Sequence, residues 1–130
     1  MGNPVMQWQV ITPDPEAHAR FYGELFDWKI DANNALAYRQ SSSGDARGID
    51  GGFWPSPPNV RPFVQLFVEV EDVPAAFQRA LELGATAVVP PQKLPDGGEL
   101  AILHDPTGMS FGLARTAQPP AKRASAKGGR

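Results

Sequence analysis

The sequence predicts an α+β domain in which paired βαβββ modules form a curved eight-stranded mixed sheet with two helices on its outer face. Two observations predict this class. First, each half of the 130-residue chain has the same order: a strand, a helix with an acidic cap and three short strands. Second, the halves superimpose with an offset of 58 residues, which places Gln7 on Gln65, Asp14 on Asp72 and Leu25 on Leu83. Neither half has enough sheet to close a core alone, so the two should pack together.

The first half begins with an alternating strand at 5–12, followed by a helix that should end near Phe26. Asp14 can accept hydrogen bonds from the free N–H groups of the first helical turn, and Pro15 suits the first helical position. Three short strands should follow. They are predicted at 28–31, 35–40 and 48–54, with turns at 33–34 and 41–45 and a glycine turn or bulge at 51–52.

A proline-rich linker at 55–62 precedes the second half. A strand is predicted at 63–70, and Asp72 should cap a helix that Gly84 ends in a left-handed conformation. Residues 86–89 should form a strand that Pro90-Pro91 breaks. The last two strands, 99–104 and 109–115, are predicted to form a hairpin around Asp105-Pro106-Thr107-Gly108.

Composition places the chain among soluble one-domain proteins, because 42% of its residues are hydrophobic and 20% are charged. The sequence contains no cysteine, which excludes disulfides, thiolate metal sites and cysteine nucleophiles and favours a cytoplasmic location. The first residues do not have the pattern of a secretory signal, and no apolar run approaches the ~20 residues that span a membrane. We therefore expect no membrane partner.

Charge divides the chain into an acidic body and a basic tail. All fourteen acidic residues lie at or before Asp105, whereas four of the twelve basic residues lie in the last nine positions. Without those four, eight basic residues face fourteen acidic ones, so the body carries about −6 and should not bind nucleic acid. We predict a folded domain at 1–115, with halves at about 5–54 and 63–115. Residues 116–130 should form a disordered, solubilising tail or, alternatively, an electrostatic tether to an anionic partner.

The capped helix of the first half carries Phe21-Tyr22 and runs into Leu25-Phe26-Asp27-Trp28. The second half carries the Asp-Pro-x-Gly hairpin at 105–108 followed by an apolar strand. These motifs resemble the vicinal-oxygen-chelate superfamily, which includes glyoxalases, bleomycin-resistance proteins and dioxygenases and whose pattern has Gly at position 27. The resemblance covers about residues 5–115. It extends to a metal-poor branch similar to the mycobacterial 27 kDa antigen and implies a homodimer.

Members of this superfamily that are enzymes hold a divalent metal with side chains that project into the cup of the sheet. The matching positions in this chain are Gln7, Gln65, Gly112 and a place near Gly52. Neutral amides and glycines make a poor cation cage, because they supply no charged ligand. We therefore expect no bound metal and no cofactor.

Strand alternation predicts the residues that line the cup. Gln7, Gln9, Gln65, Phe67 and Glu69 should share its concave face, whereas Trp8, Val10, Leu66, Val68 and Val70 should lie under the helices. Trp54 and Phe63 flank the linker and are candidates for an aromatic wall or, alternatively, for the core. His104 is a weak candidate for a general base, with a turn-flanking role as the alternative, and Glu69 is a weak catalytic candidate or a salt-bridge partner at the rim.

Three functional hypotheses follow. In the first hypothesis, the chain is a metal-free module that binds an aromatic or quinone-like ligand. The residues expected to bind this ligand are Gln7, Gln9, Trp54, Phe63, Gln65 and Phe67. Alternatively, it is a superfamily enzyme (a lyase, isomerase or dioxygenase) with displaced ligands such as His104 and Glu69, or a structural subunit that makes contacts through the linker and tail. The sequence leaves open whether the protein is an enzyme, because one fold supports many reactions.

Overall fold

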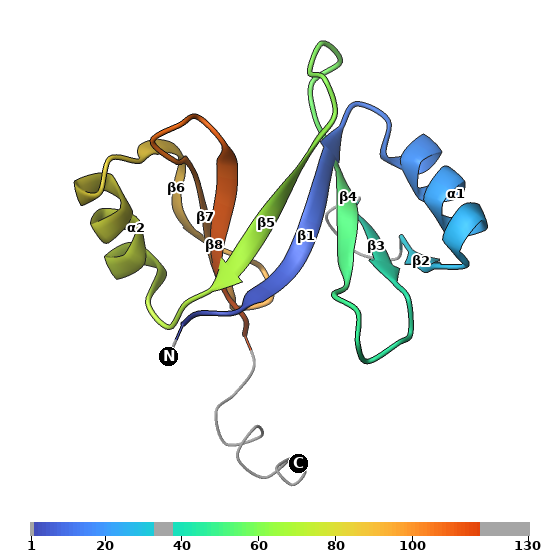
Figure 1. The fold of residues 1–130 in the computed structure, drawn as a ribbon, viewed down its shortest axis with the longest axis horizontal. Helices are drawn as coiled ribbons and strands as arrows, with labels where there is room; N and C mark the ends of the chain where they lie inside the picture. The colour runs from blue at the N-terminus through green and yellow to red at the C-terminus, as the bar shows by residue number, and fades with distance from the viewer. Residues whose placement is uncertain (1, 33–37, 118–130) are drawn as a thin grey trace, which may run out of the picture. The chain divides into compact units, whose positions relative to one another are not determined.

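The computed structural model describes residues 2–32 and 38–117 (Figure 1). Two helices and an eight-stranded mixed sheet are found in these residues, which confirms the predicted α+β class. The chain divides into two compact units: the first spans Gly2–Val68, and the second begins at Glu69. The first unit holds β1 (Val5–Thr12), α1 (Pro15–Phe26), β2 (Lys29–Asp31), β3 (Arg39–Ser42), β4 (Gly51–Pro55) and β5 (Phe63–Glu69), whose last residue already belongs to the second unit. The second holds α2 (Val73–Glu82), β6 (Thr86–Lys93), β7 (Glu99–His104) and β8 (Ser110–Arg115).

Within the first unit the strand order is β2-β3-β4-β1-β5, with β1 parallel to β4 and the other neighbours antiparallel. β1 and β5 pair so that Trp8 lies opposite Leu66, with Gln7 opposite Phe67 and Gln9 opposite Gln65.

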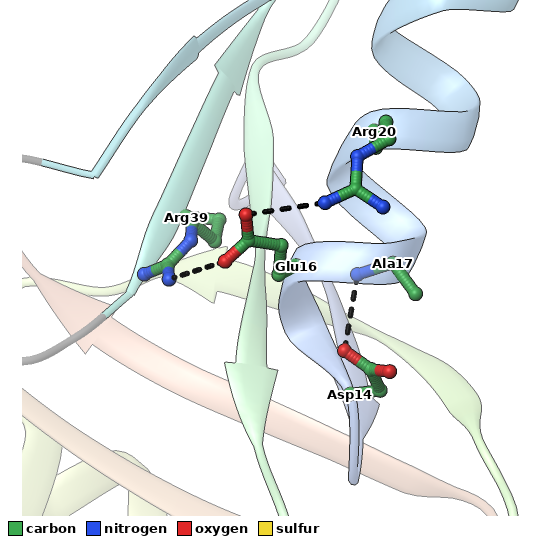
Figure 2. Close-up of polar contacts among 5 residues, drawn as sticks. All are labelled: Asp14, Glu16, Ala17, Arg20 and Arg39. Atoms are coloured by element: carbon green, nitrogen blue, oxygen red, sulfur yellow. Dashed lines mark hydrogen bonds and ion pairs between the residues drawn. The ribbon is translucent and has the colours of Figure 1, made fainter.

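Helix α1 has the predicted cap. Asp14 accepts a hydrogen bond from the Ala17 amide at 3.1 Å, and proline occupies the first turn. The helix packs on β4, β3 and β2. Figure 2 shows how Glu16 joins the helix to β3, because its carboxylate lies 3.4 Å from Arg39 and 3.3 Å from Arg20.

Aromatic rings fill the space between α1 and the sheet. The Trp8 ring centroid lies 5.4 Å from that of Trp28 and 5.6 Å from that of Phe53, and Tyr22 stacks on Phe53 at 6.2 Å. Phe53 is 1% exposed. The predicted position of Trp8 and Val10 on the helix side of β1 is confirmed, since both line a cavity there with Tyr22.

The second unit pairs β8, β7 and β6 in antiparallel order. Asp72 caps α2 by accepting from the Ala75 amide at 3.0 Å, and Gly84 has φ 106° after the helix. Both features were predicted. The core beneath α2 consists of Val73, Ala101, Leu103 and Leu113.

Three sequence predictions were wrong in detail. β6 continues through Pro90-Pro91 to Lys93, because it is an edge strand with a shifted register between Val89 and Gln92, where a missing N–H costs little. β3 includes Ser41 and Ser42, which were expected in a turn. Gly51 and Gly52 lie inside β4 and not in a turn. The expected strand at 35–40 and tail at 116–130 fall partly outside the described residues.

No helix among the described residues is long and apolar enough to cross a membrane.

Candidate ligand site on the amide face

The candidate site lies on the face of β1 and β5 that points away from α1, here called the amide face. The antiparallel register places Gln7 opposite Phe67, Gln9 opposite Gln65 and Ile11 opposite Phe63, and opposed residues of a ladder share one face. The shared face predicted for Gln7, Gln9, Gln65 and Phe67 is therefore confirmed. The parallel register of β1 with β4 adds Trp54 beside Ile11.

The floor of the amide face is polar and buried. Gln9 is 4% exposed, Gln65 is 3% exposed, and Phe67 beside them is 1% exposed. A carboxamide carries both a donor and an acceptor of hydrogen bonds. Two adjacent buried amides therefore place several donors and acceptors side by side in the floor of this face.

Tyr38 joins the amide face, which the sequence did not predict. Its ring stacks on Trp54 with centroids 4.8 Å apart and 23° between the planes. It also lies over Gly52, so that a Cβ atom at position 52 would collide with the phenol. A glycine inside a strand often marks such a close approach, and this was the signal in the sequence that pointed to a bulky neighbour.

The indole nitrogen of Trp54 is buried and has no hydrogen-bond partner among the described residues. Buried donors are nearly always paired, so an unpaired one needs an explanation. An acceptor atom brought by a ligand would satisfy it.

The donor set of this face does not fit a divalent cation. Gln9, Gln65 and Gln7 offer neutral oxygens, and the space next to Gly52 is filled by the Tyr38 phenol. Burial, with a smaller contribution from the charge of Asp50, raises the pKa of Tyr38 to about 12, so the phenol stays protonated and supplies no anionic ligand near neutral pH. The described residues contain no group of three or more His, Cys, Asp or Glu side chains that could hold a metal ion, and the predicted fourth position, Gly112 in β8, has no side chain.

The two weak catalytic candidates lie on different strands, and Glu69 follows Phe67 of the amide face by two residues in β5. His104 is the exposed last residue of β7, opposite Ser110, and Glu69 is the half-buried last residue of β5. Within the described ranges, no hydrogen bond or ion pair joins them. The structure therefore assembles no acid–base pair from these two residues.

The comparisons with known proteins agree with this fold. Residues 7–114 match the family described as "Glyoxalase-like domain". Two curated mycobacterial proteins, both named "Putative glyoxylase CFP32", come from Mycobacterium bovis and Mycobacterium tuberculosis. Each is 27% identical to this chain over an alignment of 108 residues, gaps included, that covers 78% of this chain. The chain spans only 41% of the length of these relatives.

Solved structures show the same fold at low sequence identity. Hypothetical protein BH1468 from Bacillus halodurans superimposes with a TM-score of 0.69 at 12% identity, and the superposition covers 92% of this chain and 98% of that protein's chain. A variant of methylmalonyl-CoA epimerase from Streptomyces coelicolor, in complex with 2-nitronate-propionyl-CoA, has a TM-score of 0.60 at 16% identity. That superposition covers 88% of this chain and 97% of the epimerase chain. Since the family match spans nearly all of the described chain, the protein belongs to the glyoxalase-like domain family of the vicinal-oxygen-chelate superfamily.

Proposed function

We propose that the amide face binds a small, flat and partly polar organic molecule, aromatic or quinone-like, without a divalent metal. The observation that carries this proposal is the buried cross-strand pair Gln9–Gln65 between aromatic side chains on the same face. Amides pair with the carbonyl and hydroxyl groups of such a ligand, and aromatic walls accept its ring.

The Tyr38–Trp54 stack supports a specific mode of binding. The Tyr38 ring covers one face of Trp54. A ligand ring that takes the place of Tyr38 exchanges one aromatic stack for another, which changes the free energy little because each stack contributes about 0.5–1.5 kcal/mol. The ligand then gains a hydrogen bond from the unpaired Trp54 N–H.

The role that follows is stoichiometric capture or sensing of a metabolite, with Gln7, Phe63 and Phe67 completing the wall of the site. The donor set described above argues for binding without a metal. The alternative is a superfamily enzyme that holds its metal with non-standard ligands. An activity that depends on an added divalent ion would favour this enzyme over the metal-free binding protein. A cytoplasmic location and a homodimer stay predictions.

Nuclear magnetic resonance can test the proposal, with 1,4-naphthoquinone as the probe. The absence of cysteine removes the thiols with which quinones react most readily. We expect the indole N–H signal of Trp54 (assigned by its loss in Trp54→Phe) to shift on titration, before and after treatment with EDTA. Cyclohexane-1,4-dione, which has the carbonyls without the aromatic ring, should bind much more weakly.

A matched pair of variants sharpens the test. Gln65→Met removes a buried amide at nearly constant volume and should weaken binding about tenfold, the loss of about one hydrogen bond. Gln92→Met makes the same change on the exposed edge strand β6 and should leave binding unchanged. An unperturbed Trp54 signal at millimolar probe, or binding that EDTA abolishes, would overturn the proposal.

A further inference from the structure

Four aromatic side chains of the first unit surround a cavity between α1 and the sheet, here called the aromatic cage. The cage has a volume of about 160 Å³ and is lined by Trp8, Val10, Tyr22, Trp28 and Phe53. Its wall, as the described residues form it, exposes only apolar atoms. The rings of Trp8, Tyr22 and Trp28 are only half-buried, so the cage is open to solvent.

The rings of the cage stand at different angles and do not form one flat stack. The Trp8 ring is tilted by 40° to Trp28 at a centroid distance of 5.4 Å, and it meets Phe53 at 72° and 5.6 Å. Tyr22 is nearly parallel to Phe53 and to Trp28, with 12° and 22° between the planes. Because neighbouring centroids are this close, a group in the cavity lies within about 6 Å of several rings, the range over which a ring face attracts a cation.

The wall of the cage selects among cations. The indole N–H of Trp8 donates to the Ile49 carbonyl oxygen at 2.8 Å, so this polar group has its partner already. A primary ammonium ion is strongly hydrated and needs hydrogen-bond acceptors when it leaves water, and an apolar wall supplies none. A quaternary ammonium ion has no N–H group to satisfy, and ring faces attract it, those of tryptophan most strongly. The cage therefore suits a fully methylated cation.

The charges next to the cage favour a cation. Helix α1 has no basic residue in its last turn, so no side chain there neutralises the partial negative charge of the helix end. Asp27 caps this end, directly before Trp28, and makes no ion pair with any described residue. The nearest cation in the chain, Lys29, lies on the side of β2 away from α1, because Ile30 after it contacts Gly23 of the helix.

We propose that the aromatic cage binds a quaternary ammonium group that carries a short polar arm, as in choline. A trimethylammonium group is similar in size to benzene, which an apolar cavity of about 150 Å³ accommodates, so it fits the cage. A second cavity of about 230 Å³ shares Tyr22 with the cage and is otherwise lined by Ala17, His18 and Phe21. This cavity has room for the arm, and the His18 imidazole supplies a hydrogen-bonding group for its hydroxyl.

The cage and the amide face are separate sites on opposite sides of β1, because Trp8 alternates with Gln7 and Gln9 along the strand. This inference does not rest on the proposed function. The chain has three tryptophans: Trp8 and Trp28 belong to the cage, and Trp54 belongs to the amide face. Their indole N–H signals therefore report the two sites separately. Quinone binding without choline binding would contradict only this inference, and the reverse result would contradict only the proposed function.

Choline and 3,3-dimethylbutan-1-ol test the cage in the native chain, because the two molecules have the same shape and only choline is charged. Titration with choline should shift the indole N–H signals of Trp8 and Trp28, assigned by their loss in Trp8→Phe and Trp28→Phe, and leave that of Trp54 in place. Choline should bind at least tenfold more tightly than the neutral alcohol, because a desolvated cation gains this much from ring faces. Equal affinity for the two probes, or no shift of Trp8 and Trp28 up to about 100 mM choline, would overturn the inference.

A matched pair of variants at one position completes the experiment. Trp28→Leu and Trp28→Phe both replace the indole by a smaller apolar side chain, but only phenylalanine keeps a ring face. With the Trp8 signal as the readout, choline should bind Trp28→Leu at least threefold more weakly than Trp28→Phe, whereas the neutral alcohol should bind both alike. If choline binds the two variants equally, the ring face of residue 28 does not hold the cation and the proposed site is wrong. The comparison of the two probes in the native chain needs no variant to fold.

Discussion

Gly51 and Gly52 are adjacent in β4, yet adding one methyl group at each should have different results. A Cβ at position 51 would collide with the Trp8 indole and also with the Trp8 backbone oxygen. At position 52 the three nearest atoms that a Cβ would meet all belong to the Tyr38 side chain. Because a side chain can rotate and a paired strand cannot, Gly51→Ala must separate β1 from β4, whereas Gly52→Ala only displaces Tyr38.

The magnitudes follow from these contacts. Overpacking of a core costs about 1–3 kcal/mol, and we place Gly51→Ala at the upper end because backbone is involved. Gly52→Ala loses the Tyr38–Trp54 stack, which contributes about 0.5–1.5 kcal/mol. It regains about 0.4–1 kcal/mol, because alanine lowers the conformational entropy of the unfolded chain, so the net cost is below about 1 kcal/mol. Thermal unfolding followed by circular dichroism should give a midpoint about 10 °C lower for Gly51→Ala and only a few degrees lower for Gly52→Ala.

Tyr38→Ala provides the decisive background. Once the phenol is absent, Gly52→Ala should cost nothing or stabilise slightly, while Gly51→Ala should cost as much as before. The coupling energy with Tyr38 should therefore be about 1 kcal/mol for position 52 and close to zero for position 51. If Gly52→Ala destabilises the Tyr38→Ala chain as much as the native chain, the Tyr38 ring does not lie over Gly52 and the description of the site is wrong.

Three further predictions concern single features of the fold. Because burial, with Asp50, raises the pKa of Tyr38 to about 12, its neutral form stabilises the fold fully below pH ~10, and roughly 1–2 kcal/mol should be lost between pH 10 and 12. Absorbance at 295 nm should show a step near pH 12 that Tyr38→Phe removes. Asp72→Ala should lower the free energy of unfolding in urea by about 1 kcal/mol, and Asp72→Asn, which keeps an acceptor for the helix, by clearly less. Replacing Gln9 and Gln65 together by Leu should abolish binding of the quinone probe, because Leu supplies neither a donor nor an acceptor; probe binding that persists in this double variant would show that the amides do not hold the ligand.

Much of the fold could be predicted because its signals are local. The period of two along residues 5–12 determines which side chains of β1 share a face, and Asp14 and Asp72 satisfy helix N–H groups only three residues away. Alternation in β1 and β5 was also sufficient to group Gln7, Gln9, Gln65 and Phe67. Their position opposite one another depends on the register, which no local pattern specifies.

The parts that were missed depend on contacts between distant strands. Tyr38 reaches Gly52 and Trp54 because β3 pairs with β4 so that Gln40 lies opposite Gly52, and no local pattern specifies that register. Pro90-Pro91 was expected to end a strand, because proline cannot donate a hydrogen bond to a neighbouring strand. An edge strand tolerates proline, and whether a strand lies at an edge is a property of the whole sheet.

The position of Tyr38 explains through packing, as well as through composition, why the place beside Gly52 fits a cation poorly. If glycine at position 52 were the only obstacle, Gly52→Glu would restore an acidic ligand next to the amide of Gln9, which lies beside it in the parallel register. The phenol of Tyr38 fills that space, so the new carboxylate should be forced away and the single variant should bind Mn²⁺ no better than the native chain. In Gly52→Glu combined with Tyr38→Ala the carboxylate has room beside two amide oxygens, and calorimetry should detect binding in the millimolar range, about 4 kcal/mol. Equal Mn²⁺ affinity of the single and double variants would mean that Tyr38 does not control access to this place.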